Sequence, residues 1–235
     1  MSGLSPDESG ACAATSPGLR AAMSSGRANG LKSMDTNNGT APALDLAPAA
    51  RQIRELAGSV DDGQLDGPTP CPDYAVRELL GHLLGLTVAF RDAAYKKHGP
   101  TTGTPPRSSL PVLPDDWRST LPPLLDELVE AWRSPAALEG MTRAGGVDLP
   151  GEVAGMVARN ELVVHGWDLA RATGQEFRAD EASLRSSEAM LAPGDDDRSG
   201  PDAIFGPPVP VPADAPLVDR VIALSGRRPD WRPGD

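Results

Sequence analysis

The sequence is poor in aromatic residues, cysteine and positive charge, and each shortage argues against a class of protein. Aromatic residues make up 4% of the 235 positions, whereas Gly and Pro number 25 each, which is typical of a chain that packs only in part. Two cysteines are too few for a disulfide framework and favour a reducing, cytoplasmic location. The formal net charge of −11 argues against a nucleic-acid partner, whose phosphates need a basic surface.

Long apolar runs are also lacking. The longest candidate, Leu79–Phe90, is interrupted by His82 and falls short of the roughly 18–20 residues of a bilayer span. The first residues do not show the basic-then-apolar pattern of a secretory signal. We therefore expect a cytoplasmic protein without a membrane partner. Residues 1–41, dominated by Ser, Gly, Ala, Asn and Thr, are predicted to form a disordered tail because they have little apolar surface to bury.

The remaining chain is predicted to be all-α, because apolar residues recur at helical spacing and no segment alternates as a strand does. Residues 42–175 contain four predicted helices, which favours a four-helix bundle: Asp45–Val60, Tyr74–Lys97, Pro122–Trp132 and Pro150–Thr173. Residues 99–123 are predicted to be a long loop. Residues 176–235 are predicted to be a C-terminal appendage with a Pro-rich loop between two short helices, about Asp180–Ala192 and Asp214–Ser225.

Polar residues on apolar helix faces are the informative feature. His82 shares a face with Leu79 and Leu86, so its ring is expected to point inward. Glu161 and His165 are four residues apart and therefore neighbours on one helix face. Asp168 follows His165 at a spacing of three and is also expected to face inward.

A buried carboxylate needs compensation, because leaving it unpaired costs several kcal/mol. One solution is a cation held by His82, Glu161 and His165, a ligand set that suits Zn²⁺ or another divalent metal and leaves open positions. Asp168 would then accept a hydrogen bond from a ligand imidazole. The alternative is a metal-free bundle in which Glu161 pairs with a histidine and Asp168 pairs with Arg171.

Two segments carry a family resemblance at these same residues. The segments from Thr69 to His82 (TPCPDYAVRELLGH) and from Asn160 to Gly174 (NELVVHGWDLARATG) resemble the mycothiol-dependent maleylpyruvate isomerase metal-binding domain family, one of the DinB/YfiT-like bundles. The resemblance extends from about Leu44 to Gly174. It implies helices that run up-down-down-up and metal ligands at the His of the first motif and the Glu and His of the second, which are His82, Glu161 and His165.

The resemblance also implies a function. It predicts a metal-dependent enzyme that activates mycothiol, either to transfer it to a small electrophile or to isomerise that electrophile. The identity of the electrophile is left open. The protein is expected to be a monomer or a homodimer. Arg143, in the Gly-rich stretch before the fourth helix, is a candidate clamp for a substrate carboxylate. Cys71 is predicted to be a buried structural thiol rather than a nucleophile. The alternatives are a metal-dependent hydrolase that activates water and a non-catalytic metal-binding bundle.

Overall fold

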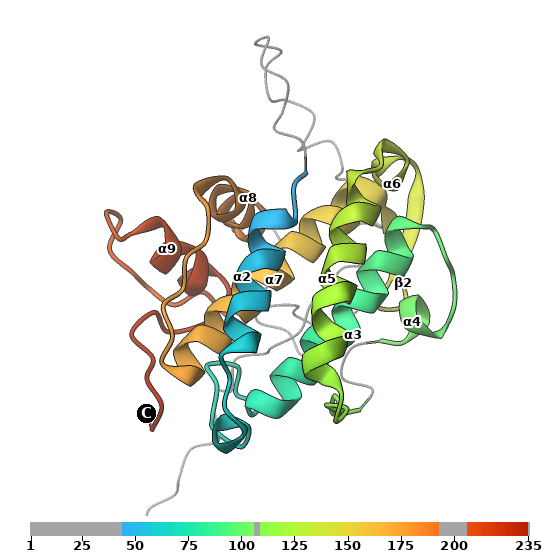
Figure 1. The fold of residues 1–235 in the computed structure, drawn as a ribbon. Coiled ribbons are helices and arrows are strands. Elements are labelled where there is room, and N and C mark those ends of the chain that lie inside the picture. The colour runs from blue at the N-terminus through green and yellow to red at the C-terminus, as the bar shows by residue number, and fades with distance from the viewer. Residues whose placement is uncertain (1–43, 106–108, 193–205, 235) are drawn as a thin grey trace, which may run out of the picture.

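Four helices pack around one hydrophobic core, and the predicted α-helical fold is confirmed, with one small two-stranded sheet added to it. The computed structural model describes residues 44–105, 109–192 and 206–234, so the predicted disordered tail lies outside the described residues. The four helices are α2 (Ala47–Gly58), α3 (Val76–Ala94), α5 (Trp117–Arg133) and α7 (Gly151–Thr173). In Figure 1, α2 and α7 run in one direction while α3 and α5 run in the other, the up-down-down-up order implied by the resemblance.

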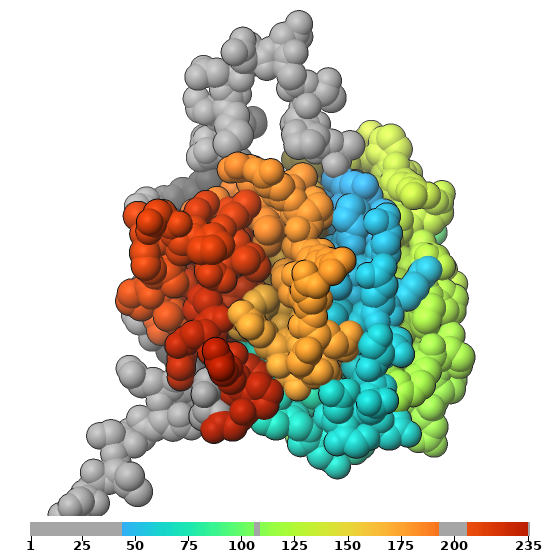
Figure 2. All heavy atoms as spheres, turned by 60° about the vertical axis from the view of Figure 1, so that its left-hand side comes forward, coloured from blue at the N-terminus to red at the C-terminus, as the bar shows by residue number. Residues whose placement is uncertain are grey.

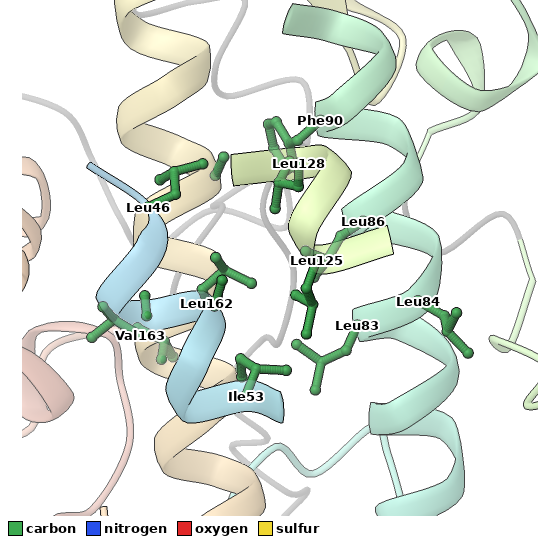
Figure 3. Packing of buried hydrophobic residues seen from close by; sticks show 14 of the residues in the cluster. Leu46, Ile53, Leu83, Leu84, Leu86, Phe90, Leu125, Leu128, Leu162 and Val163 are labelled. Carbon is green, nitrogen blue, oxygen red and sulfur yellow. The ribbon is translucent and has the colours of Figure 1, made fainter. Parts of the chain in front are cut away.

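The core forms where the apolar faces of these helices meet. Figure 3 shows side chains from all four helices converging, among them Ile53 of α2, Leu83 of α3, Leu125 of α5 and Leu162 of α7. Each of these four is at most 1% exposed, and burying one such side chain contributes about 1.5–3 kcal/mol. The helices therefore stay together because each supplies an apolar stripe at helical spacing.

Helix α5 is longer than the sequence predicts. The expected start was Pro122, but the helix begins at Trp117 and holds Pro122 and Pro123 inside it. Proline lacks a backbone N–H and normally costs about 3 kcal/mol in a helix interior. Trp117 and Leu121 are almost completely buried, so tertiary burial favours the extra turns despite the two prolines.

A two-stranded hairpin corrects the prediction that the chain has no strands. Strands β1 (Met141–Ala144) and β2 (Val147–Pro150) pair antiparallel. Gly145 and Gly146 connect them with φ angles of 56° and 79°, the left-handed backbone that a tight hairpin turn requires. Thr142 Oγ1 donates to the carbonyl of Ala93 at 2.5 Å, which ties the hairpin to the end of α3. The short helices α4 (Pro100–Gly103), inside the predicted loop, and α6 (Pro135–Leu138) were also not expected.

Beyond α7, the chain forms the two short helices that the sequence predicts, α8 (Glu181–Leu191) and α9 (Leu217–Leu224). Helix α8 packs on α7, and α9 packs on α8. Figure 2 shows this C-terminal segment, in orange and red, as a layer against one side of the molecule. The division into domains at residue 175 stays a prediction. None of the helices in the described parts of the chain combines the length and apolarity that crossing a membrane requires.

Candidate metal centre

One histidine from α3 and a glutamate–histidine pair from α7 come together inside the fold. His82 Nε2 lies 3.4 Å from Glu161 Oε2, and His165 Nε2 lies 3.2 Å from the same oxygen. One candidate ligand atom from each residue lies within 4.8 Å of the others. We call these three residues the His–Glu–His cluster. The structure thus unites the three residues that the sequence analysis singled out.

The spacing of these atoms fits ligands that share one cation. Zinc bonds of about 2.0–2.1 Å in tetrahedral geometry place neighbouring ligand atoms about 3.3–3.4 Å apart. Two imidazole nitrogens and a carboxylate oxygen also match the donor preferences of divalent first-row metals. The residues present therefore fit a bound divalent metal ion.

Helix α7 holds two residues of the cluster in a buried environment. Glu161 is 3% exposed and His165 is 2% exposed. Burial opposes the charge on Glu161, but hydrogen bonds from His165 and His82 outweigh it and lower the pKa of this carboxyl to about 2. Burial lowers the pKa of His82 below its usual value, which favours the neutral ring. At neutral pH the cluster therefore offers an ionised carboxylate and, at His82, a neutral imidazole.

Asp168 contacts the ring of His165, as the spacing of three residues between them predicted. The Nδ1 atom of His165 lies 3.0 Å from Asp168 Oδ2, and Asp168 is completely buried. An Nδ1–H that donates to this carboxylate leaves the Nε2 lone pair directed toward the cluster. Without a bound cation, burial alone would disfavour the charged ring, but the Asp168 and Glu161 carboxylates raise the pKa of His165. The negative carboxylates thus make this position favourable for positive charge.

Arg227, which follows α9, is a partner of Asp168 that the sequence did not predict. Its Nε donates to Asp168 Oδ1 at 2.8 Å and its Nη2 donates to Asp168 Oδ2 at 2.9 Å. The Nη1 atom donates to the carbonyl of Ser225 at 3.1 Å, and the arginine is only 6% exposed. The alternative Asp168–Arg171 pair is wrong, because Arg171 instead donates to the carbonyl of Pro229. No local spacing connects residues this far apart in the chain.

A cavity of about 680 Å³ reaches the cluster at His82 and Glu161. This volume lies within the range of small-molecule sites. Its wall comes from α3, α4, the first half of α5, the turn of the β1–β2 hairpin and the segment that leads into α5. The cluster therefore has access to a space that a small substrate would fill.

Two glycines on α3 border this cavity, but their surroundings differ. A Cβ built on Gly81 would lie 2.9 Å from the carbonyl oxygen of Val112, whereas one on Gly85 would meet nothing within 4 Å. Gly81 therefore allows the segment before α5 to cross closely over α3 beside His82. Of the two glycines, only Gly85 leaves open space at this wall.

Exchanging each glycine for alanine should change stability in opposite directions. Gly81→Ala should lower the free energy of unfolding by about 1–3 kcal/mol, because the backbone at Val112 must shift. Gly85→Ala should raise it by about 0.5–1 kcal/mol, because alanine restricts the unfolded chain. Urea unfolding monitored by circular dichroism measures both variants. Equal destabilisation would contradict the close crossing at Gly81.

The two remaining candidate residues lie outside the cluster. Arg143 lies on β1, where its guanidinium makes two hydrogen bonds to Asp148 across the hairpin. It does not line the cavity, and its role as a substrate clamp stays a prediction without structural support. Cys71 is fully buried, as expected, but it is disulfide-bonded, so the prediction of a buried structural thiol is wrong.

Comparison with known families gives a match over the bundle. The model of the family described as "Mycothiol maleylpyruvate isomerase N-terminal domain" matches residues 46–170, a range that includes the whole His–Glu–His cluster. Two uncharacterized proteins of Mycobacterium tuberculosis, from strains CDC 1551 / Oshkosh and ATCC 25618 / H37Rv, are each 26% identical over 190 residues. Each alignment covers 79% of this chain and 97% of the relative.

Comparison with solved structures shows a similar fold. The crystal structures of the mycothiol-dependent maleylpyruvate isomerase and of its histidine-to-alanine mutant each superpose with a TM-score of 0.50 at 16% identity. The alignment covers 62% of this chain and 66% of the isomerase chain. At this identity the likeness concerns the fold alone.

Proposed function

Since the chain belongs to the mycothiol maleylpyruvate isomerase N-terminal domain family, we propose that it is a metal-dependent enzyme that activates a small thiol, mycothiol, against a small electrophile. The reaction would transfer the thiol to the electrophile or isomerise the electrophile through reversible thiol addition. One observation carries this proposal: the His–Glu–His cluster, spaced as ligands of one cation, lies at the end of a cavity of substrate size.

His82, Glu161 and His165 would hold the divalent ion, with Zn²⁺ as the proposed metal. When bound, such an ion lowers the pKa of a coordinated thiol well below the free value of about 8.5. The surroundings favour a cation because Glu161 and Asp168 are both buried carboxylates. Arg227 compensates the charge of Asp168 through its hydrogen bonds to that carboxylate.

The residues of the chain itself would hold the metal ligands in fixed positions. Asp168 holds the ring of His165 through Nδ1, and Arg227 holds Asp168. The ring of Tyr74 lies 5.4 Å from that of His82, centroid to centroid, and also borders the cavity. A site with fixed ligands brings the thiol and the electrophile together and thereby lowers the entropic part of the barrier.

A thiol-dependence assay tests the proposal. The metal-loaded protein should accelerate the loss of a reactive enone only when mycothiol is added. Removing the metal with a chelator should return the rate to the uncatalysed background, as should His82→Ala. The exposed His98 provides the matched control, and His98→Ala should keep the full rate.

Three results would contradict the proposed function. Turnover that needs the metal but no added thiol would indicate a hydrolase that activates water. Stoichiometric metal without any thiol-dependent rate would indicate a non-catalytic metal-binding bundle. A thiol-dependent rate that survives both the chelator and His82→Ala would show that the His–Glu–His cluster does not supply the activity.

A further inference from the structure

The cavity beside the cluster has an apolar wall. Helix α3 contributes Leu84, Leu86, Val88 and Phe90, and α5 contributes Leu124. In Figure 3, Leu84 lies on the side of α3 that faces away from α2 and α7. This side chain and its neighbours therefore present an apolar surface to whatever occupies the cavity.

The polar part of the wall is mostly uncharged. Away from the cluster it consists of the hydroxyl residues Tyr74, Thr101, Thr104, Ser109 and Thr120. Among the described residues that line the cavity there is no lysine and no arginine. The chemically active end is formed by His82 and Glu161.

Nearby cations are engaged elsewhere. Arg91 makes ion pairs with Asp92 and Glu127, and Lys96 donates to the carbonyl of Ala137. Arg143 is held by Asp148 across the hairpin, as described above. These three basic side chains thus direct their charges to other partners.

From this wall we infer that the electrophile is a neutral, largely apolar molecule rather than a dicarboxylate. A carboxylate moved into an apolar site without a partner loses its hydration and gains nothing in return. An apolar substrate gains free energy in proportion to the area that it buries. The inference rests on the proposed function, because it assigns the substrate class of the same site.

An activated carbon–carbon double bond is one electrophile of this class. In the addition of a thiol, a carbon–sulfur bond forms while the carbon–carbon π bond breaks. The thiol proton ends on the neighbouring carbon, so the addition needs no oxidant, reductant or third reactant. Methyl cinnamate and cinnamate both carry this double bond and differ only in whether the carboxyl group is esterified, which makes them a matched pair of probes.

A displacement experiment on the metal-loaded protein tests the inference. The neutral fluorophore N-phenyl-1-naphthylamine, which brightens in apolar surroundings, is bound first and then displaced by each probe. Methyl cinnamate should bind at least about tenfold more tightly than cinnamate, because only cinnamate must bury a charge. Equal binding, or tighter binding of cinnamate through its carboxylate on the metal ion, would overturn the inference.

An added charge in the wall provides the structural check. Val88→Arg introduces a guanidinium at the cavity wall and should reduce or reverse the preference for the ester. Ala136→Arg places the same side chain on the exposed face of α6, outside the cavity lining, and should leave the preference unchanged. An unchanged preference in Val88→Arg would show that the probes bind elsewhere, which also overturns the inference.

The binding measurement separates this inference from the proposed function, because it needs no turnover. A clear ester preference without any thiol-dependent rate would support the apolar site and reject the enzyme. Metal- and thiol-dependent turnover of a dicarboxylate at a rate equal to or above that of its neutral ester would support the enzyme and overturn the substrate class.

Discussion

Replacing His165 with alanine is expected to abolish stoichiometric metal binding. Protein purified without a chelator should contain about one divalent ion per chain, since the cluster supplies one set of three ligands. His82→Ala should have the same effect, because either substitution leaves only two ligands. Glu161→Gln keeps the shape of the side chain but removes its charge, and it should weaken the site strongly. Elemental analysis and equilibrium dialysis with Zn²⁺ measure these changes.

His98 supplies the control for this experiment. It is the one histidine of the chain outside the cluster and it is exposed. His98→Ala therefore makes the same chemical change away from the cluster. This variant should keep its metal content, and circular dichroism should show that all variants remain helical. Equal metal content in the wild type and in every variant would refute the assignment of His82, Glu161 and His165 as ligands.

The second large effect is expected at Arg227. Arg227→Gln should lower the free energy of unfolding by about 3–5 kcal/mol, because it leaves the buried Asp168 carboxylate without its main partner. Metal affinity should also fall, by about 10–100-fold, since Asp168 then positions His165 less firmly. Urea unfolding reports the first effect, and competition with a colorimetric zinc chelator reports the second. The affinity loss is the result that a merely structural arginine would not produce.

Arg220 offers a matched control from the neighbouring helix. It pairs with Glu188, and both side chains remain partly open to water, where ion pairs contribute little. Arg220→Gln should therefore change stability far less than Arg227→Gln and leave metal affinity unchanged. Adding Asp168→Asn to Arg227→Gln should recover part of the lost stability, because the uncompensated charge is removed. Equal effects of Arg220→Gln and Arg227→Gln would contradict the proposed role of Arg227.

Local periodicity predicted most helices closely. Helix α7 was expected over Pro150–Thr173 and spans Gly151–Thr173. Helix α5 was predicted too short because a proline pair normally marks a first turn, and only the folded chain shows that Trp117 is buried. The β1–β2 hairpin had a signal in Gly145-Gly146, a common turn pair between short strands, but its strands have four residues each and show little alternation.

In the candidate site, too, some features follow from local sequence and others depend on tertiary packing. The inward-facing positions of Glu161 and His165 follow from helical spacing, and so does the contact of His165 with Asp168. The partner of Asp168 does not, since Arg227 and Asp168 are 59 residues apart. Nor does the cavity, whose wall combines α3, α4, α5 and the hairpin turn.

The amino-acid sequence by itself determined the approximate positions of the four long helices and the faces on which His82, Glu161, His165 and Asp168 lie. These features depend on residues within a few positions of one another, and a 3.6-residue period makes them readable. Only the tertiary structure decided that the cluster lies beside an apolar cavity and that an arginine from the C-terminal segment supports it. Those features depend on how distant segments pack, which no local pattern of residues specifies.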